Sequence, residues 1–276
     1  MSEVDAGSPS QAAPLVCAVS HAVASDPGRY RSTNEDSCLA LPAREGGPAV
    51  HLFAVADGLG GHNAGDVASR LVVESFERSL AGGVDRAERW VRSAFTTANL
   101  AVHDHAVEHP DVFGMQSTAT LLLLEGNRAV IGHVGDCRAY LVRGGDADLC
   151  TTDHSRAMEM LRMRIITPEQ AVDHPMRNQL TRSLGAEILL QVDISRRDLA
   201  GGDTLVLCCD GLWSEVGGAE IADIAGTAPP AEAAEKLVAT ALEREAPDNV
   251  SVIVVRVEDL AAGTAEGRGR RFRWWR

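Results

Sequence analysis

Aspartates stand repeatedly where an apolar stretch of the sequence meets a turn. Asp57, Asp136 and Asp210 each follow such a stretch, Asp248 precedes one, and Asp36 adds a fifth carboxylate. If these stretches are strands that end at one edge of a sheet, the carboxylates converge, and their unpaired negative charges repel one another. A bound cation would remove that repulsion, so the pattern predicts a metal site.

The side chains on offer favour Mg²⁺ or Mn²⁺ over zinc. Carboxylate, carbonyl and water oxygens are the ligands that these ions prefer, and no Cys/His set of the kind that binds zinc lies nearby. A single Asp-Gly pair is more often an ordinary turn. Four aspartates at strand ends, together with the acidic pair Glu35-Asp36, favour the metal site.

A site of several carboxylates that share more than one metal ion suggests phosphate ester hydrolysis. Two ions about 3.5 to 4 Å apart can activate water and hold a phosphoryl group. Such a site also needs a cationic side chain for the phosphate oxygens. Arg31, five residues before Asp36, is the candidate, because a guanidinium binds phosphate through two parallel hydrogen bonds. A solvated loop arginine is the alternative for Arg31.

The elements that must position these residues are short strands and amphipathic helices. Apolar runs predict strands at 15–23, 50–56, 118–124, 129–134, 138–142, 190–195, 204–209 and 250–257. Helical patterns cover 64–80, 85–108, 156–163, 168–172, 220–225 and 231–244. In the first helix, Val67, Leu71, Ser75 and Leu80 are expected to share the buried face. Two long helices in succession favour a layered α+β sandwich over a doubly wound sheet.

Composition and charge narrow the class of protein. The 276 residues carry a net charge of −13, which argues against a nucleic-acid binder. No apolar run approaches the roughly 18 residues needed to span a bilayer. The first residues lack the features of a secretory signal, and six cysteines without C-x-x-C spacing are expected to be reduced core thiols. The expected compartment is the cytoplasm.

The order of the motifs resembles that of a known family, the metal-dependent protein phosphatases of the protein phosphatase 2C (PPM) type in their bacterial serine/threonine form. The resemblance runs from about residue 20 to residue 257. The motifs, in the family's order, are RSTNED at 31–36, ADGLGGH at 56–62, GMQST at 114–118, GDCR at 135–138, TDHS at 152–155, CDGL at 209–212 and DN at 248–249. The implied fold is a four-layer αββα sandwich of two antiparallel sheets flanked by helix pairs.

The resemblance implies a role for each site residue. Asp57 would bridge two Mn²⁺ or Mg²⁺ ions, the Gly58 carbonyl would bind one of them, and Asp210 and Asp248 would hold the other. Asp36 would be a further ligand, with Glu35 beside it, and Arg31 would bind phosphate. Asp136, with Asp210, matches a third metal site. The implied reaction is direct attack of the bridging water on the phosphorus of phosphoserine or phosphothreonine.

Three places depart from the family pattern. Where bacterial members usually have Met-Gly-Thr-Thr, this chain has MQST at 115–118, so the strand entrance is bulkier and a local packing change is expected. Leu59 replaces a histidine that has been proposed as general acid in animal relatives, and His62 has no supported role as acid. Residues 156–185 resemble a mobile flap beside the active site, and Arg164 occupies a position where glycine is common.

The expected organisation is a lead-in at 1–13, a catalytic domain at 14–258 and a tail at 259–276. Residues 264–276 carry a net charge of +4, which leaves −17 on the rest. The tail could contact an anionic membrane surface, an acidic partner or the acidic body of this protein, or stay solvated. The expected partners are phosphorylated protein substrates and an opposing Ser/Thr kinase, with the chain acting as a monomer. The alternatives are a catalytically silent phosphoprotein-binding module and a small-molecule phosphoesterase.

Overall fold

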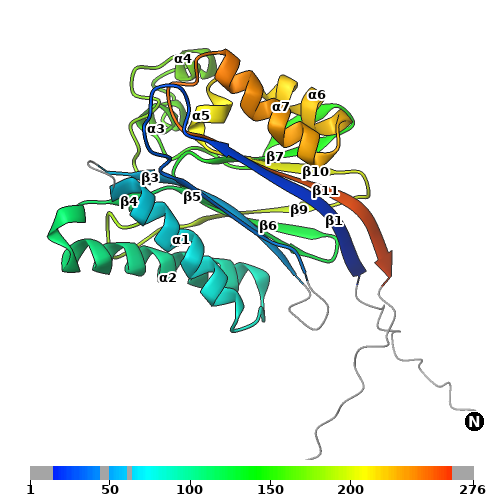
Figure 1. Ribbon diagram of the computed structural model, residues 1–276, viewed down its shortest axis with the longest axis horizontal. Coiled ribbons are helices and arrows are strands. Elements are labelled where there is room, and N and C mark those ends of the chain that lie inside the picture. The colour runs from blue at the N-terminus through cyan, green and yellow to red at the C-terminus, as the bar shows by residue number, and fades with distance from the viewer. Residues whose placement is uncertain (1–14, 44–49, 61–63, 263–276) are drawn as a thin grey trace, which may run out of the picture.

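The computed structural model describes residues 15–43, 50–60 and 64–262. The expected lead-in at 1–13, His62 and residues 263–276 of the tail lie outside this part of the chain. The architecture is the predicted α+β sandwich, with two antiparallel sheets packed face to face and helices on both outer sides (Figure 1). Among the described residues, no helix combines the length and the apolar composition needed to cross a membrane.

The first sheet joins the two ends of the described chain. Its strands, in spatial order, are β1 (Leu15–Asp26), β11 (Val250–Ala262), β10 (Thr204–Cys208), β7 (Arg138–Arg143) and β8 (Asp146–Leu149). β1 and β11 pair along their whole length, with a bulge at Ala18/Val19. β11 therefore runs to Ala262, beyond the expected end of the catalytic domain at residue 258.

The second sheet carries part of the predicted site. Its strands, in order, are β2 (Asp36–Leu41), β3 (His51–Leu59), β5 (Ala119–Glu125), β6 (Arg128–Val134) and β9 (Asp193–Asp198), and the short β4 (Gln116–Ser117) pairs with β3. Both faces of β3 are covered. Leu52 and Ala54 pack toward the helices, whereas Phe53 and Val55 pack between the sheets. This explains why β3 reads as a continuous apolar run rather than as an alternating one.

Helix pairs form the outer layers. α1 (Ala64–Leu80) and α2 (Ala87–Glu108) share a hydrophobic core with the second sheet, and α6 (Gly218–Thr227) and α7 (Pro230–Glu243) share one with the first. The smaller helices are α3 (Arg156–Arg162), α4 (Pro168–Val172), α5 (Asp210–Trp213) and a 3₁₀ turn at Pro110–Val112. Figure 1 shows α3, α4 and α5 gathered at one end of the sandwich.

The buried face of α1 differs from the one expected. Ala68, Val72 and Phe76 are fully buried, and so is Ser75 of the expected set, whereas Val67 and Leu71 are only partly buried. The residues at i, i+4 and i+8 from Ala68 point into the core that α1 shares with the second sheet and with α2. Val67 and Leu71 pack at the border of that core, which rotates the buried stripe by about one residue.

Candidate metal centre

Asp36 and Asp57 face each other on two hydrogen-bonded strands. They are register partners in the antiparallel pair β2–β3, a position in which like charges destabilise a sheet. Both carboxylate oxygens of Asp36 are buried, and neither has a hydrogen bond of normal geometry among the described residues, although the Ser251 hydroxyl and the Cys209 thiol lie near. Burial raises the pKa of Asp36 to about 7, and the charge on Asp210 adds to this rise.

Three further aspartates come from three other parts of the chain. Asp210 begins α5 directly after β10, Asp136 lies just beyond β6, and Asp248 lies just before β11. Burial and the neighbouring carboxylates hold the pKa of Asp57 well above its usual range. Burial and the charge on Asp248 raise the pKa of Asp210 to about 6. Each of these carboxylates shifts the pKa of another, so the predicted aspartates lie close together, at one end of the sandwich.

The cluster fits a divalent cation by its chemistry. Within the described ranges, no three His, Cys, Asp or Glu side chains form a ready-made group of metal ligands. The donors that meet here are nonetheless all oxygen atoms, which suits Mg²⁺ or Mn²⁺. In the described part of the chain, the buried oxygens of Asp36 have no hydrogen bond of normal geometry. Carboxylates that repel one another in a poorly solvated place are costly without a counter-charge. A cation would satisfy both conditions.

Gly58 occupies a point of the site where no side chain would fit. A Cβ at Gly58 would lie 1.9 Å from the carbonyl oxygen of Gly65 and 2.7 Å from that of Glu35. The Gly58 amide donates to the Glu35 carbonyl at 3.1 Å. This close approach fixes the start of α1 and the residue before β2 against Asp57. Burial raises the pKa of the Glu35 carboxyl, while Arg31 and the Gly65 amide act in the opposite direction.

Arg31 lies beside one of the predicted ligands. Its Nη2 donates to Oδ2 of Asp248 at 2.8 Å, and the two side chains are 48% and 39% exposed. This hydrogen bond and the charge of Asp248 raise the pKa of Arg31, so the guanidinium stays positive. A half-exposed guanidinium at the edge of the carboxylate cluster can receive an anion from solvent.

Asn249 organises the loop that carries Arg31. Its Oδ1 accepts from the Glu35 amide at 2.8 Å, and its Nδ2 donates to the carbonyls of Pro27 and Thr33 at 2.9 and 3.0 Å. The residue is 4% exposed. Asn249 belongs to the DN motif at 248–249, but the sequence predicted no role for it. Its buried amide satisfies three backbone groups of a loop that has little secondary structure of its own.

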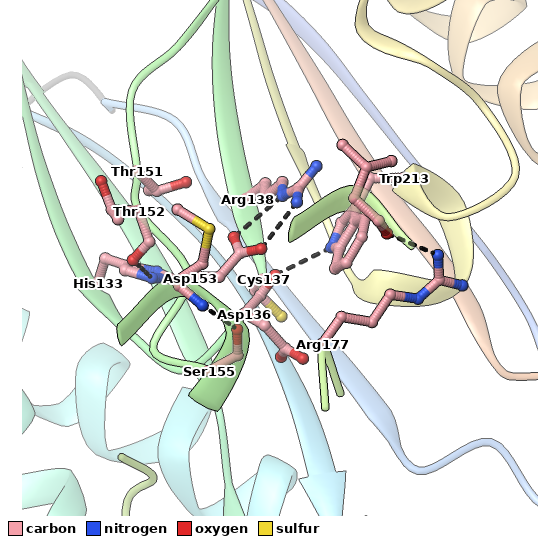
Figure 2. A network of polar contacts seen from close by, with 12 residues as sticks. His133, Asp136, Cys137, Arg138, Thr151, Thr152, Asp153, Ser155, Arg177 and Trp213 are labelled. Atoms are coloured by element: carbon pink, nitrogen blue, oxygen red, sulfur yellow. Dashed lines mark hydrogen bonds and ion pairs between the residues drawn. The ribbon is translucent and has the colours of Figure 1, made fainter. Parts of the chain in front are cut away.

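Trp213 was missed as a site residue, and it holds the main chain at Asp136. Trp213 Nε1 donates to the Asp136 carbonyl at 2.9 Å, and the Arg138 guanidinium lies 3.6 Å from the centre of the Trp213 ring (Figure 2). Arg138 in turn donates to both carboxylate oxygens of Asp153, at 3.0 and 2.7 Å. This network fixes the main chain at Asp136, whose side chain is buried.

His154 holds the same loop from its other side. The Gly135 amide donates to His154 Nδ1 at 3.0 Å, and the His154 amide donates to the Gly135 carbonyl at 2.7 Å. With Nδ1 accepting, Nε2 carries the proton and lies 3.2 Å from Oδ2 of Asp193. Both partners lie in motifs of the family, at 135–138 and 152–155, but the sequence does not show that these two motifs pair.

The segment resembling a flap is connected to the sheet beside the site. Leu184 forms an isolated bridge with Ser117, and the Ser183 hydroxyl donates to Oε1 of Gln116 at 2.6 Å. The packing change expected at Gln116 is therefore a polar contact with the flap segment. Arg164, where glycine was expected, has a φ of 59°, in the left-handed region that favours glycine.

Comparisons with known proteins agree with this geometry. The family described as protein phosphatase 2C matches residues 21–250. The chain is 35% identical over 250 residues to the serine/threonine protein phosphatase PstP of Mycobacterium tuberculosis, covering 89% of this chain and 46% of PstP. It is 34% identical to the serine/threonine phosphatase stp of Listeria monocytogenes, covering 88% of this chain and 96% of that protein.

A solved structure gives the same result at the level of the fold. The catalytic domain of PstP, in complex with two manganese ions, superposes with a TM-score of 0.77 at 33% identity and covers 89% of this chain and 100% of that one. The chain spans about half the length of full PstP. The match extends over most of this chain, and the chain belongs to the protein phosphatase 2C family.

Proposed function

We propose that this protein is a metal-dependent protein serine/threonine phosphatase. The observation that carries the proposal is the pair Asp36–Asp57, two carboxylates that face each other on adjacent strands. Both oxygens of Asp36 are buried and have no hydrogen bond of normal geometry among the described residues. The proposal also draws on the relatives in the family, which are named serine/threonine phosphatases. An arrangement that costs stability in the protein alone is expected where a bound cation is part of the function.

The ligand roles follow the family's pattern. Asp57 is proposed to contact two ions, with the Gly58 carbonyl on one and Asp210 and Asp248 on the other. Asp36 and Glu35 support the same centre, and Asp136 with Asp210 forms a third position. Mn²⁺ or Mg²⁺ bound here would activate water and offset the negative charge of the phosphoryl group. The fold would contribute by holding these carboxylate oxygens close together despite their mutual repulsion.

Arg31 is proposed to bind the phosphate of the substrate. Its guanidinium is charged, half exposed and fixed next to Asp248 by one hydrogen bond. The remaining N–H groups can donate to two phosphate oxygens at once, which also orients the ester bond. Asn249 keeps this loop in place through its contacts with Pro27, Thr33 and Glu35.

The expected partners and compartment are further parts of the proposal. Substrates would be phosphoproteins modified by an opposing Ser/Thr kinase, and the enzyme would act as a monomer. All six cysteines are free thiols, which supports a reducing compartment such as the cytoplasm. For the basic segment 264–276, an acidic partner or an anionic membrane surface remains the proposed contact.

Phosphate release from a phosphothreonine peptide tests the function. Metal-stripped protein should be inactive, Mn²⁺ should restore turnover, and Asp210→Ala should abolish it while the protein stays folded by circular dichroism. A folded protein that is inactive with and without Mn²⁺ would instead indicate the silent binding module. Faster hydrolysis of free phosphometabolites than of phosphopeptides would indicate a small-molecule phosphoesterase.

A further inference from the structure

A groove rich in arginine lies at the end of the second sheet that is remote from the aspartates. The groove has a volume of about 790 Å³ and lies between the start of α2, the start of β6 and the end of β9. Its arginines are Arg86, Arg89, Arg92, Arg128, Arg196 and Arg197, and its acidic residues are Glu88, Glu125 and Asp198. We refer to it as the arginine groove. β6 runs from Arg128 in the groove to Val134, two residues before Asp136, so the groove and the metal centre occupy opposite ends of one strand.

The arginine groove has the opposite sign to the rest of the molecule. Its six arginines and three acidic residues leave a net charge of +3, in a chain whose net charge is −13. Two arginines have carboxylate partners: Arg196 contacts Glu88, and Arg128 lies 3.9 Å from Asp198. Among the described residues, Arg86, Arg89, Arg92 and Arg197 have no carboxylate within ion-pair distance. Their guanidinium groups give the groove its uncompensated charge.

The start of α2 adds to this positive potential. Arg86 is the N-cap of this helix, and its side chain makes no capping hydrogen bond. The first amides of a helix carry a partial positive charge and favour anions. The backbone and the side chains therefore act in the same direction.

The groove is open rather than enclosed, which points to a polypeptide as its ligand. The side chains of Arg128 and Arg196 are 77% and 69% exposed, whereas a pocket for a small molecule buries most of its ligand. The strongly acidic body disfavours nucleic acid. We propose that the arginine groove docks an acidic segment of the phosphoprotein substrate, rich in Asp, Glu or phosphorylated residues, while a separate phosphoresidue occupies the metal centre. This inference rests on the proposed phosphatase function.

The distance between the two sites sets the length of the linker in the substrate. Residues 128 to 136 span about 25 Å of nearly extended chain at about 3.3 Å per residue. A flexible substrate segment must follow the curved surface, so about 10 to 15 residues between the phosphoresidue and the acidic segment would reach both sites. Binding at the groove would then raise the effective concentration of the phosphoresidue at the metal centre.

Two matched phosphopeptides test the proposal. Each contains the same phosphothreonine sequence and a 12-residue Gly/Ser linker, followed by six glutamates in one peptide and six glutamines in the other. The test variant is Arg86→Glu/Arg89→Glu, at two exposed positions of the groove. The control is Arg78→Glu/Lys236→Glu, which makes the same change of charge at two exposed helical positions outside it.

The wild-type protein should prefer the glutamate peptide in kcat/KM by about tenfold at low salt. The groove variant should lose this preference, the control should keep it, and all three proteins should hydrolyse p-nitrophenyl phosphate equally. Equal kcat/KM for both peptides in the wild type would overturn the proposal, as would an equal loss of preference in both variants.

Binding without turnover separates this inference from the proposed function. Fluorescence anisotropy of a labelled hexaglutamate peptide with metal-free protein measures binding of an acidic segment without any turnover. Binding that is lost in Arg86→Glu/Arg89→Glu supports the groove even if no substrate is hydrolysed. Tighter binding of an oligonucleotide or of anionic lipid vesicles of matched charge, lost in the same variant, would overturn the assignment to a polypeptide.

Discussion

Asp36 and Asp57 are proposed to bind metal ions, but in the metal-free protein they lower its stability. Facing carboxylates on paired strands repel, and the described residues offer the oxygens of Asp36 no hydrogen bond of normal geometry. The cost is tolerable because the sandwich has three hydrophobic clusters that do not depend on these groups. Residues that break a local rule of stability in this way mark functional sites.

The substitution Asp57→Asn should therefore stabilise the metal-free protein while it removes activity. In EDTA, we expect the free energy of unfolding to rise by about 1 kcal/mol, because the variant no longer buries a carboxyl group among other carboxyl groups. With Mn²⁺ present, turnover should fall by at least about 100-fold, and the stabilisation that Mn²⁺ gives to the wild type should disappear. Urea unfolding and phosphate release measure the two effects, with Asp85→Asn as a surface control. Normal manganese content and full turnover would disprove the assignment of Asp57.

A second residue-scale prediction concerns pH. His51 is buried, its Nδ1 accepts from the Ala43 amide at 3.1 Å, and its Nε2 donates to the Cys17 carbonyl at 2.8 Å. Burial lowers the pKa of His51, so below about pH 6.5 the unfolded chain binds a proton more readily than the folded protein. Stability is therefore lost as the pH falls through that value toward the lower folded pKa.

The variant His51→Gln offers an amide oxygen to the Ala43 amide and an amide N–H to the Cys17 carbonyl, and it does not titrate. Its urea midpoint should decline less between pH 7.5 and pH 5 than that of the wild type. Parallel declines in the two proteins would show that His51 does not contribute to acid sensitivity.

At the scale of elements, the central strands and the long helices could be predicted because their patterns are strong. α1 and α4 begin and end at the predicted residues, and β3, β5, β6, β7 and β10 lie within two or three residues of the predicted ranges. These strands are buried on both faces or on most of their length. Strands that are buried in this way consist of long apolar runs, and such runs are easy to recognise in the sequence.

The elements that were missed lie at edges or are very short. β2 begins with Asp36 and has only one fully buried residue, β8 is mostly exposed, and α5 has four residues. β9 was placed at 190–195 because of its apolar start, but the strand is Asp193–Asp198 and contains two arginines. Edge strands need little hydrophobic surface and often carry charge, so their sequences resemble loops.

Some residues of the candidate site could likewise be predicted from the sequence, and others could not. The carboxylates and Arg31 could be found because each stands in a recognisable motif or directly beside an apolar run. Trp213 and Asn249 act through contacts with residues far away in the sequence, Asp136 and Pro27 among them. No periodicity or spacing encodes such a pairing, so only the fold reveals it.

One element-scale prediction concerns the end of α3. The Ile165 amide donates to the Met160 carbonyl and the Arg164 amide to the Leu161 carbonyl, each at 2.9 Å. This pattern is a Schellman motif, in which the left-handed position is usually glycine, and here Arg164 occupies it. Arg164→Gly should relieve about 1 kcal/mol of strain and slow amide hydrogen exchange in residues 160–166 about fivefold.

The matched control for this prediction is Arg162→Gly, two residues earlier, at the last helical residue of α3. It should accelerate exchange in the same residues, because glycine is a poorer helix former than arginine. If both variants accelerate exchange, Arg164 makes a stabilising contact that outweighs its backbone strain.

At the scale of the whole molecule, the described core and the basic segment 264–276 are separate in sequence and opposite in charge. All predicted site residues lie between Arg31 and Asp248, and the last strand ends at Ala262. Deleting 264–276, which changes the net charge from −13 to −17, should leave kcat/KM for p-nitrophenyl phosphate unchanged within about twofold. A loss of tenfold or more would show that this segment supports the active site.

The pairing of β1 with β11 has a consequence for when the protein can first act during its synthesis. Asn249, at the start of β11, supplies the side-chain hydrogen bonds that fix the loop carrying Arg31 and Glu35, and Asp248 lies beside it. A nascent chain in which these residues have not yet left the ribosome would lack the proposed metal ligand Asp248 and the contacts that order the loop of Arg31. β1 also cannot pair until β11, more than 220 residues later in the chain, has been synthesised. Newly made chains should therefore not dephosphorylate anything until translation has passed β11.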